Sequence, residues 1–260
     1  MMAVVLSAKA EVEFAYEAGA DLVSAYLWRG QYNGGLSFQP EALVGFNAKD
    51  EAIQFRAGAW GNVGASDWKF KKDQGDGTGF TRFMPEVDFM ATLYLYGLNL
   101  GFTEYYYCDD FSTATSEVTL GYNFSHFFGE NAGAYFNWNT TVAGNDFITD
   151  GAGNDVRAWS SYLEVGYDYT FEKPGITLGA QVGMSPWASD LYGNSGFAVT
   201  NISLKLNKEW EFEHVTLDLY AQGSVNPDGI NKSNIYINEA GDDKLYLQKL
   251  NGCIGLGFWF

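Results

Sequence analysis

The sequence contains little cysteine, histidine, proline or basic residue. Its 260 residues include two cysteines, two histidines and five prolines, and 15 lysines and arginines stand against 32 aspartates and glutamates, giving a net charge of −17. Such a charge argues against a nucleic-acid partner, because phosphate binding needs a basic surface. Two histidines also supply few of the ligands that a zinc site needs. We therefore expect no metal and no cofactor.

The sequence also lacks a long apolar run. A transmembrane helix needs about 18 or more consecutive apolar residues, so none is expected. A closed β-barrel is the other structure that satisfies its backbone hydrogen bonds inside lipid. A barrel strand gives a weaker signal, about ten residues of alternating hydrophobicity between turn residues. The 31 glycines and the aromatic content of 17% are compatible with such a structure.

About twelve segments of the chain alternate between apolar and polar residues, and hardly any helical pattern is present. In the clearest segment, residues 83–95, Phe89 and Ala91 alternate with Asp88 and Thr92. Because successive residues of a strand point to opposite faces, nearly every segment would present one apolar face. A wall that faces lipid requires this pattern.

The connections between these segments differ in length at the two ends. One set is short and comprises residues 47–52, 96–98, 125–131, 171–175 and 207–214. The other is long, rich in glycine, aspartate and asparagine, and includes residues 63–82, 143–156, 187–196 and 227–245. Short periplasmic turns and long extracellular loops are typical of outer-membrane barrels. The sequence thus predicts an all-β fold: a single closed antiparallel transmembrane β-barrel of about 12 strands, with both termini periplasmic.

Two features disturb this regular pattern. Pro40 and Pro85 fall within predicted strands, where proline removes a ladder hydrogen bond, so we expect bulges there. Glu104 falls on the lipid-facing parity of its segment, which predicts a register slip near residues 105–107.

The first ten residues have some features of a signal peptide. Ala8-Lys9-Ala10 matches the small-x-small cleavage site of a signal peptide, although the preceding apolar stretch is short and has no basic region. We expect residues 1–10 to be a truncated or misannotated signal peptide and residues 11–260 to form the barrel.

Cys108 and Cys253 fall on strands far apart in order, whereas a disulfide needs Cα atoms within about 7 Å. Both are predicted to be free thiols.

The C-terminal segment, residues 250–260, alternates apolar and small or polar residues and ends on Phe260. It resembles the closing strand of Gram-negative outer-membrane β-barrels, in which a terminal phenylalanine is recognised by the barrel assembly machinery. The resemblance implies that Phe258 and Phe260 form the assembly signal. It also implies the outer membrane as the location, with its lipid, its lipopolysaccharide and the assembly machinery as partners.

The first hairpin carries a second resemblance. Ser24-Ala25-Tyr26-Leu27-Trp28-Arg29-Gly30, followed by Gln39-Pro40, resembles the opening motif S-x-Y-x-(F/W)-R-G of a largely uncharacterised family of outer-membrane barrels. This resemblance implies no known activity. Arg29 is interpreted as a lumen or rim cation that holds the first loop.

The same alternation assigns polar residues to the lumen. An Arg or Lys that faces lipid at mid-membrane costs about 2–4 kcal/mol, so charged residues should point inward. The predicted lumen face carries Arg29, Glu41, Arg56, Trp60, Glu86, Asp88, Tyr94, Tyr105, Glu117, Tyr135, Tyr162, Glu164, Asp168, Lys205, Asp218, Tyr220 and Lys249. The charges would form ion pairs across the lumen, with Lys205 and Asp218 as one such pair, or line a water-filled pore that favours cations. The aromatic rings would stack on sugars or simply fill the interior.

These observations predict a passive channel for small hydrophilic solutes, with sugars and cations as candidates. The alternative is a non-conducting structural or receptor barrel, or a subunit of an envelope complex. An outer-membrane lipid hydrolase is less well supported, because His126 and His214 both fall in predicted periplasmic turns, away from the outer leaflet. Asp146, Asp150 and Asp155 lie in one loop, but their spacing fits no standard calcium loop. We expect no enzymatic activity.

Overall fold

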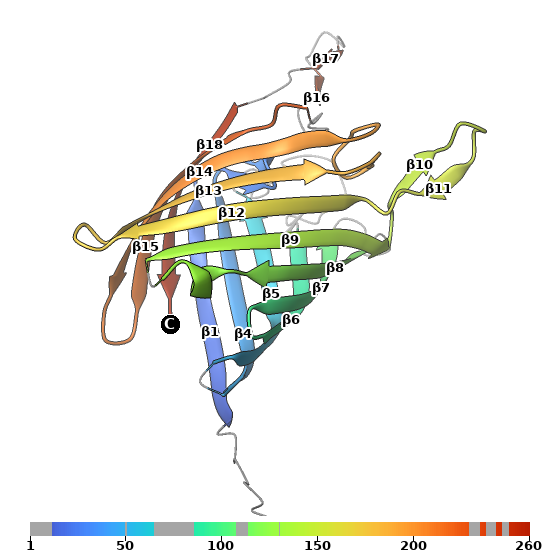
Figure 1. Cartoon of the computed structure of the whole chain (residues 1–260). Coiled ribbons are helices and arrows are strands. Elements are labelled where there is room, and N and C mark those ends of the chain that lie inside the picture. Colours follow the sequence, from blue (N-terminus) through green and yellow to red (C-terminus); the bar gives the residue numbers. More distant parts are fainter. Residues whose placement is uncertain are drawn as a thin grey trace, which may run out of the picture.

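Twelve antiparallel strands pair into a closed barrel in the computed structural model (Figure 1). The structure describes residues 12–49, 51–64, 86–107, 114–129, 131–228, 235–237, 243–245 and 250–260. The barrel strands are β1 (Val12–Val23), β4 (Ser37–Ala48), β5 (Ile53–Gly64), β6 (Glu86–Leu95), β7 (Leu98–Tyr107), β8 (Thr115–Asn123), β9 (Ala132–Ala143), β12 (Ser161–Phe171), β13 (Ile176–Ser185), β14 (Ala198–Glu211), β15 (Thr216–Val225) and β18 (Leu250–Trp259). The all-β closed barrel predicted from the sequence is therefore confirmed.

Three two-stranded sheets lie outside the barrel wall. They are β2 (Tyr26–Trp28) with β3 (Gln31–Gly34), β10 (Phe147–Thr149) with β11 (Asp155–Arg157), and β16 (Ile235–Ile237) with β17 (Asp243–Leu245). One short 3-10 turn, η3 (Ser125–Phe127), precedes β9. Within the described ranges, no helix has the length and apolar character needed to cross a membrane.

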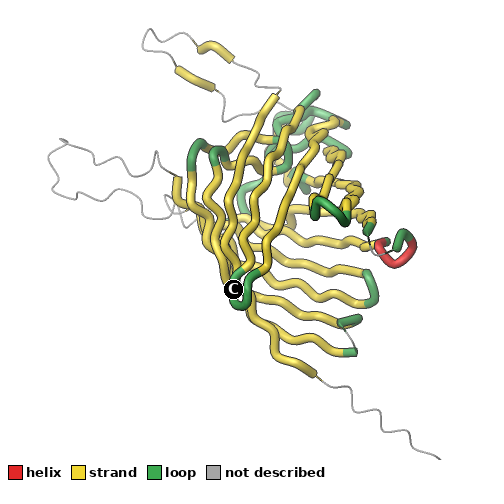
Figure 2. The backbone as a smooth tube through the Cα atoms, turned by 90° about the vertical axis from the view of Figure 1, so that its left-hand side faces the viewer, coloured by secondary structure: helices red, strands yellow, loops and turns green. Residues whose placement is uncertain are grey.

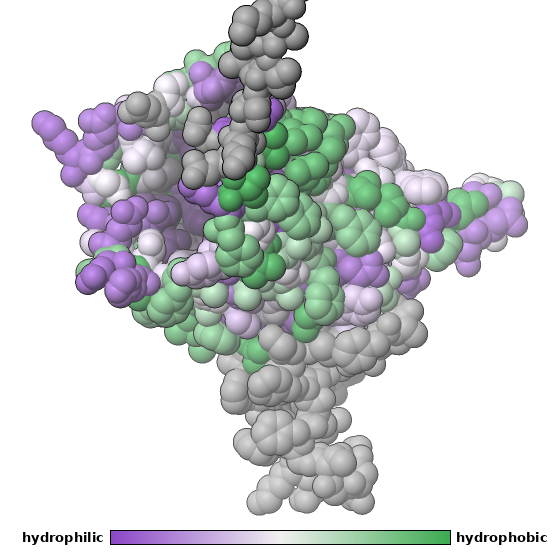
Figure 3. Space-filling view, turned by 90° about the horizontal axis from the view of Figure 1, so that it is seen from below, coloured by the Kyte–Doolittle hydropathy of each residue, from purple (hydrophilic) through white to green (hydrophobic). Residues whose placement is uncertain are grey.

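The two faces of the wall differ in polarity. Along β4, Phe38, Val44 and Phe46 point outward and are exposed, whereas Gln39 and Glu41 point inward. The same alternation leaves large apolar side chains exposed on the outside of most strands. Figure 3 shows these hydrophobic residues, in green, over the side of the barrel, while hydrophilic residues gather toward its ends.

The barrel closes between its first and last strands. β1 pairs with β4 along its whole length, but it pairs with β18 only through residues 19–23 and 255–259. Gly257 makes room for this seam, because a Cβ at that position would lie 2.5 Å from Asp21 Oδ1. Phe260 extends the seam, since its amide donates to the Ala18 carbonyl oxygen at 2.8 Å.

The short turns lie at one end of the barrel, together with the first residues of β1 and the last residues of β18 (Figure 2). The tightest joins β6 to β7 through Tyr96 and Gly97, whose φ angles of 52° and 90° suit the two-residue type I′ turn. The connections at the opposite end are longer, including residues 24–36, 144–160 and 186–197. The two ends therefore differ as the loop lengths predict.

Two sequence-based expectations about register are wrong. Pro40 causes no bulge, because Phe38↔Val63 and Glu41↔Trp60 keep the same register on either side of it. Proline there only removes a donor from the ladder. Pro85 lies outside the described residues.

The register also continues without a slip through Glu104, which pairs with Phe89 and Ser116. Its carboxylate lies on the outer face, where the Ser116 hydroxyl donates a hydrogen bond to it. The bulge in this region lies one strand pair further along, between Ser116 and Glu117 in the β8–β9 pairing.

Candidate functional site

The chain leaves the wall after β1 and folds a hairpin, residues 24–36, across the lumen. Ser24 ends the seam: its amide donates to the Ile254 carbonyl oxygen at 2.9 Å, and its hydroxyl accepts from the Ile254 amide at 2.8 Å. β2 and β3 then pair around a two-residue turn at Arg29 and Gly30, with φ angles of 50° and 82°. Positive φ at both positions is the signature of a type I′ turn.

The tip of this hairpin touches strands around the ring. A Cβ on Gly30 would lie 2.5 Å from the Thr200 carbonyl oxygen of β14, so the close approach requires glycine. The Gly30 carbonyl oxygen accepts a hydrogen bond from Asn251 Nδ2 of β18 at 3.1 Å. On the other side, Tyr26 packs against Trp60 of β5, with ring centroids 5.5 Å apart. The hairpin thus spans the lumen.

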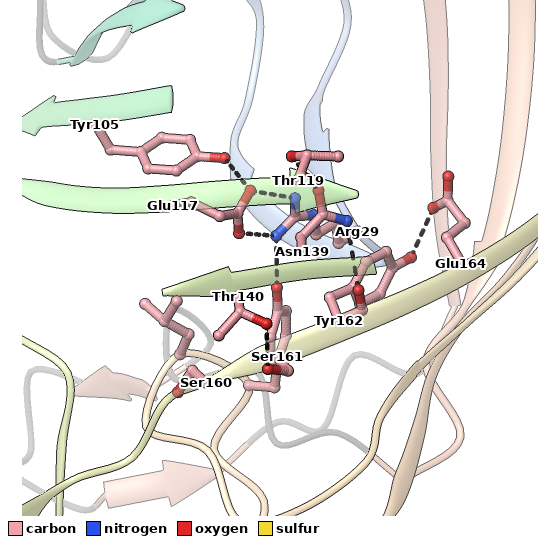
Figure 4. Close-up of polar contacts among 12 residues, drawn as sticks. Arg29, Tyr105, Glu117, Thr119, Asn139, Thr140, Ser160, Ser161, Tyr162 and Glu164 are labelled. Carbon is pink, nitrogen blue, oxygen red and sulfur yellow. Dashed lines mark hydrogen bonds and ion pairs between the residues drawn. The ribbon is translucent and has the colours of Figure 1, made fainter. Parts of the chain in front are cut away.

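Arg29 is the centre of these contacts (Figure 4). Its guanidinium donates two hydrogen bonds to the Glu117 carboxylate of β8, at 2.6 and 2.7 Å. It donates a third, of 2.7 Å, to the Tyr192 hydroxyl of the β13–β14 connection. The Arg29 and Glu117 side chains are only 14% and 3% exposed. Bidentate, charge-assisted pairs of this kind are among the strongest hydrogen bonds in proteins.

Aromatic rings enclose the guanidinium. Arg29 Cζ lies 4.7 Å from the Trp28 ring centroid and 4.9 Å from that of Tyr162. Trp28 stacks on Tyr192, with an interplanar angle of 11°. Burial raises the pKa of the Tyr192 phenol, which the Arg29 charge partly offsets. Ring faces around a cation add cation–π attraction, so charge and rings together hold the hairpin.

A second polar network continues along the wall from this cluster. Glu164 of β12 accepts hydrogen bonds from Tyr135 Oη (3.1 Å), Tyr162 Oη (2.9 Å) and Gln181 Nε2 (3.2 Å). Tyr105 Oη donates to Glu117 at 3.0 Å. Arg29, Tyr105, Glu117, Tyr162 and Glu164, all predicted to face the lumen, are therefore brought together by the fold.

A cavity of about 550 Å³ opens below this network, toward the short turns. Its lining comes from six barrel strands and three of the short turns, and most of the lining residues are polar. It includes Gln54, Tyr94, Asn99, His126, Tyr135, Asn137 and Glu164. The cavity is large enough for a small hydrophilic solute, since ligand pockets typically measure about 300–1,000 Å³.

Other predicted charges interact along the inner face of the wall, between strands that lie close together in the ring. Arg56 Nε donates to Glu17 Oε1 at 2.8 Å. Lys205 lies among Asp21, Asp168 and Asp218, and its positive charge attracts all three carboxylates.

The predicted direct ion pair between Lys205 and Asp218 is not formed. Lys205 pairs with Gln222 across the β14–β15 ladder, while Asp218 pairs with Glu209, so the two residues stand at different heights. The Lys205 ammonium instead lies 4.1 Å above the Tyr220 ring. Lys249, predicted to face the lumen, lies outside the described residues.

Sequence comparison finds no protein-family model and no curated protein that match this chain. Among solved structures, the outer membrane channel from Pseudomonas putida F1 aligns over 96% of this chain and 94% of its own, with 13% identity and a TM-score of 0.43. The anion-selective porin from Comamonas acidovorans aligns over 96% and 98%, with 9% identity and a TM-score of 0.33. The architecture of this chain rests on its own strand pairing.

The two histidines lie in short turns, and two of the loop aspartates accept hydrogen bonds from within their own loop. His126 lies in η3 and His214 in the β14–β15 turn, both at the short-turn end. Asp146 is buried and accepts hydrogen bonds from the Ser160 amide and hydroxyl. Hydrogen bonds from Asn154 and Ala152 lower the pKa of Asp150, which closes the β10–β11 turn. Over the described part of the chain, no group of three or more histidine, cysteine, aspartate or glutamate residues could hold a metal ion.

Several lumen residues were not singled out by the sequence. Glu17 and Asp21 lie at alternating positions of β1 and face the same side as Glu41, so the period of two could have identified them. Tyr192 lies in a connection without periodicity, and no sequence signal points to it. Cys253 is a buried free thiol, as predicted, and Cys108 lies outside the described residues.

Proposed function

We propose that this chain is an outer-membrane channel for small hydrophilic solutes, narrowed in its outer half by the hairpin of residues 24–36. The observation that carries the proposal is a polar cavity of about 550 Å³ inside a closed barrel whose outer face is apolar. Cations and sugars are the candidate solutes, because the cavity presents both a carboxylate, Glu164, and the rings of Tyr94 and Tyr135.

The polarity of the two faces supports the proposed membrane location. Leu204 of β14 points outward and is 59% exposed, whereas Asn137 of β9 lines the cavity. Leu204→Arg should lower the free energy of unfolding in vesicles by about 2–4 kcal/mol, because the charge would face lipid. Asn137→Arg is the control and should cost far less, because its side chain reaches water. Equal losses, measured by urea titration in vesicles, would argue against a lipid-facing exterior.

The orientation and partners of the barrel are part of the same proposal. The short turns, the start of β1 and the end of β18 would face the periplasm. The long connections would face the exterior with its lipopolysaccharide. Phe258 and Phe260 lie at the end of the closing strand and are 43% and 66% exposed, which leaves them accessible to the assembly machinery. Phe260→Ala should reduce the folded fraction in cells but not refolding into detergent micelles. A loss in both would indicate a structural role only.

The lumen charge supports a proposed preference for cations. The acidic residues Glu17, Asp21, Glu41, Glu86, Asp88, Glu117, Glu164, Asp168 and Asp218 face inward, against Arg29, Arg56 and Lys205. In planar bilayers under a KCl gradient, the reversal potential should have the sign of a cation-selective channel. Neutralising Glu86 and Asp88 together should shift it toward zero. An unchanged reversal potential would exclude these two residues from selectivity.

A non-conducting structural or receptor barrel is the second candidate, and the hairpin favours it. A lumen spanned by Arg29 and its partners could serve only to stiffen a scaffold. Planar-bilayer recording separates the two functions. The channel predicts discrete conductance steps from the refolded protein, whereas silence both with and without the hairpin would favour the scaffold.

A further inference from the structure

The lumen contains a second aromatic and acidic cluster that is built like the surroundings of Arg29. Around Arg29, one carboxylate and several ring faces enclose an organic cation. The molecule therefore shows which groups its lumen uses to hold a guanidinium.

The second cluster surrounds Asp88 of β6. Asp88 lies between Trp60 of β5 and Tyr105 of β7 in the ladder, and all three side chains face the lumen. Tyr26 of the hairpin packs against Trp60. Two positions along β6, the Glu86 carboxylate lies beside the Tyr26 and Tyr107 side chains. Rings and carboxylates again share one side of the lumen.

What distinguishes this cluster is one oxygen of the Asp88 carboxylate. Asp88 is only 6% exposed, and within the described residues its Oδ1 has no hydrogen-bond partner. Among the described side chains, no ion pair reaches Asp88, and the charges that act on it are the negative ones of Glu86 and Glu117. A buried carboxylate without compensation is costly, so this one either holds a proton or receives a cation.

We propose that Asp88, with Glu86 beside it and the rings of Trp60, Tyr26 and Tyr105 around it, binds the guanidinium or ammonium group of a small organic cation. A metal ion fits less well, because no group of three or more metal-binding side chains is present in the described ranges. Ring faces attract organic cations, and hydrogen bonds from a guanidinium would satisfy Asp88 Oδ1. The inference deepens the proposed channel function, on which its role in transport rests, by naming the solute class.

Calorimetry on the refolded full-length barrel in detergent micelles tests the site without requiring conductance. The probe is methylguanidinium, and methylurea serves as a neutral ligand of similar shape. We expect saturable binding of methylguanidinium only. Asp88→Asn should weaken it by about tenfold or more, because the variant loses a charge-assisted hydrogen bond. Asp155→Asn, a matched change on the exposed β11 strand outside the barrel, should leave the affinity unchanged.

Absence of methylguanidinium binding, equal binding of methylurea, or unchanged affinity in Asp88→Asn would each overturn the proposal. Should Asp88→Asn fail to fold, Trp60→Leu takes its place, since loss of the ring face should also weaken binding. A barrel that binds methylguanidinium at Asp88 but conducts no ions would retain this site and lose the channel function. A barrel that conducts ions but does not bind methylguanidinium would retain the channel function and lose this site.

Discussion

Replacing residues 25–35 with Asn-Gly is expected to raise the single-channel conductance several-fold. Val23 pairs directly with Ser37, so residues 24 and 36 are adjacent in the extended ladder, and a two-residue type I′ turn can join them. The change removes Tyr26, Trp28 and Arg29 from the lumen while leaving every barrel strand intact. The outer half of the lumen should then fill with water.

A matched control removes a hairpin that lies outside the barrel. β10 and β11 pair only with each other and project away from the wall in Figure 1. Replacing residues 148–156 with a short turn should leave the conductance unchanged. An equal rise in both variants would show that external loops, and not the lumen hairpin, set the conductance. No rise in either would show that the hairpin does not restrict the path.

Arg29→Ala is expected to lower the free energy of unfolding by about 3–5 kcal/mol, as is usual when one partner of a buried ion pair is removed. The reason is the Glu117 carboxylate, which is 3% exposed and would lose its counter-charge and two hydrogen bonds. Arg29→Lys should recover only part of the loss, because an ammonium cannot form the bidentate pair or stack between rings. Urea unfolding in vesicles measures both.

The double variant Arg29→Ala with Glu117→Ala completes this test. It removes the uncompensated carboxylate, so it should be more stable than Arg29→Ala alone. It should also conduct better than the wild type, because the hairpin loses its main attachment. A single-variant loss below about 1 kcal/mol, the range of exposed ion pairs, would contradict a buried, hairpin-holding role for Arg29.

The period of two in the sequence was enough to predict the barrel and the direction of its side chains. Glu41, Glu86, Asp88 and Asp168 face inward in the structure because a strand allows only two directions. Parity does not give height along the barrel axis. For this reason the predicted ion pair between Lys205 and Asp218 is wrong, although both side chains face the lumen.

The first-loop motif shows a different limit. Its residue types indicated a cation that holds the first loop, and Arg29 has that role. Its partners could not be deduced, because Glu117 and Tyr192 lie 88 and 163 residues away in the sequence. Contacts of a loop that folds across a lumen depend on the closed ring, which no local pattern encodes.

The proposed channel requires a water-filled path through this barrel, restricted by the hairpin on the loop side. Asn137→Cys, in a background with Cys108→Ser and Cys253→Ser, places one thiol on the cavity. The direct measurement is the rate of its reaction with a bulky, membrane-impermeant maleimide added to either side of oriented vesicles. We predict fast labelling from the short-turn side, slow labelling from the loop side, and similar rates from both sides once residues 25–35 are replaced. Equal rates in the intact protein, or no labelling from either side, would contradict a path of this kind.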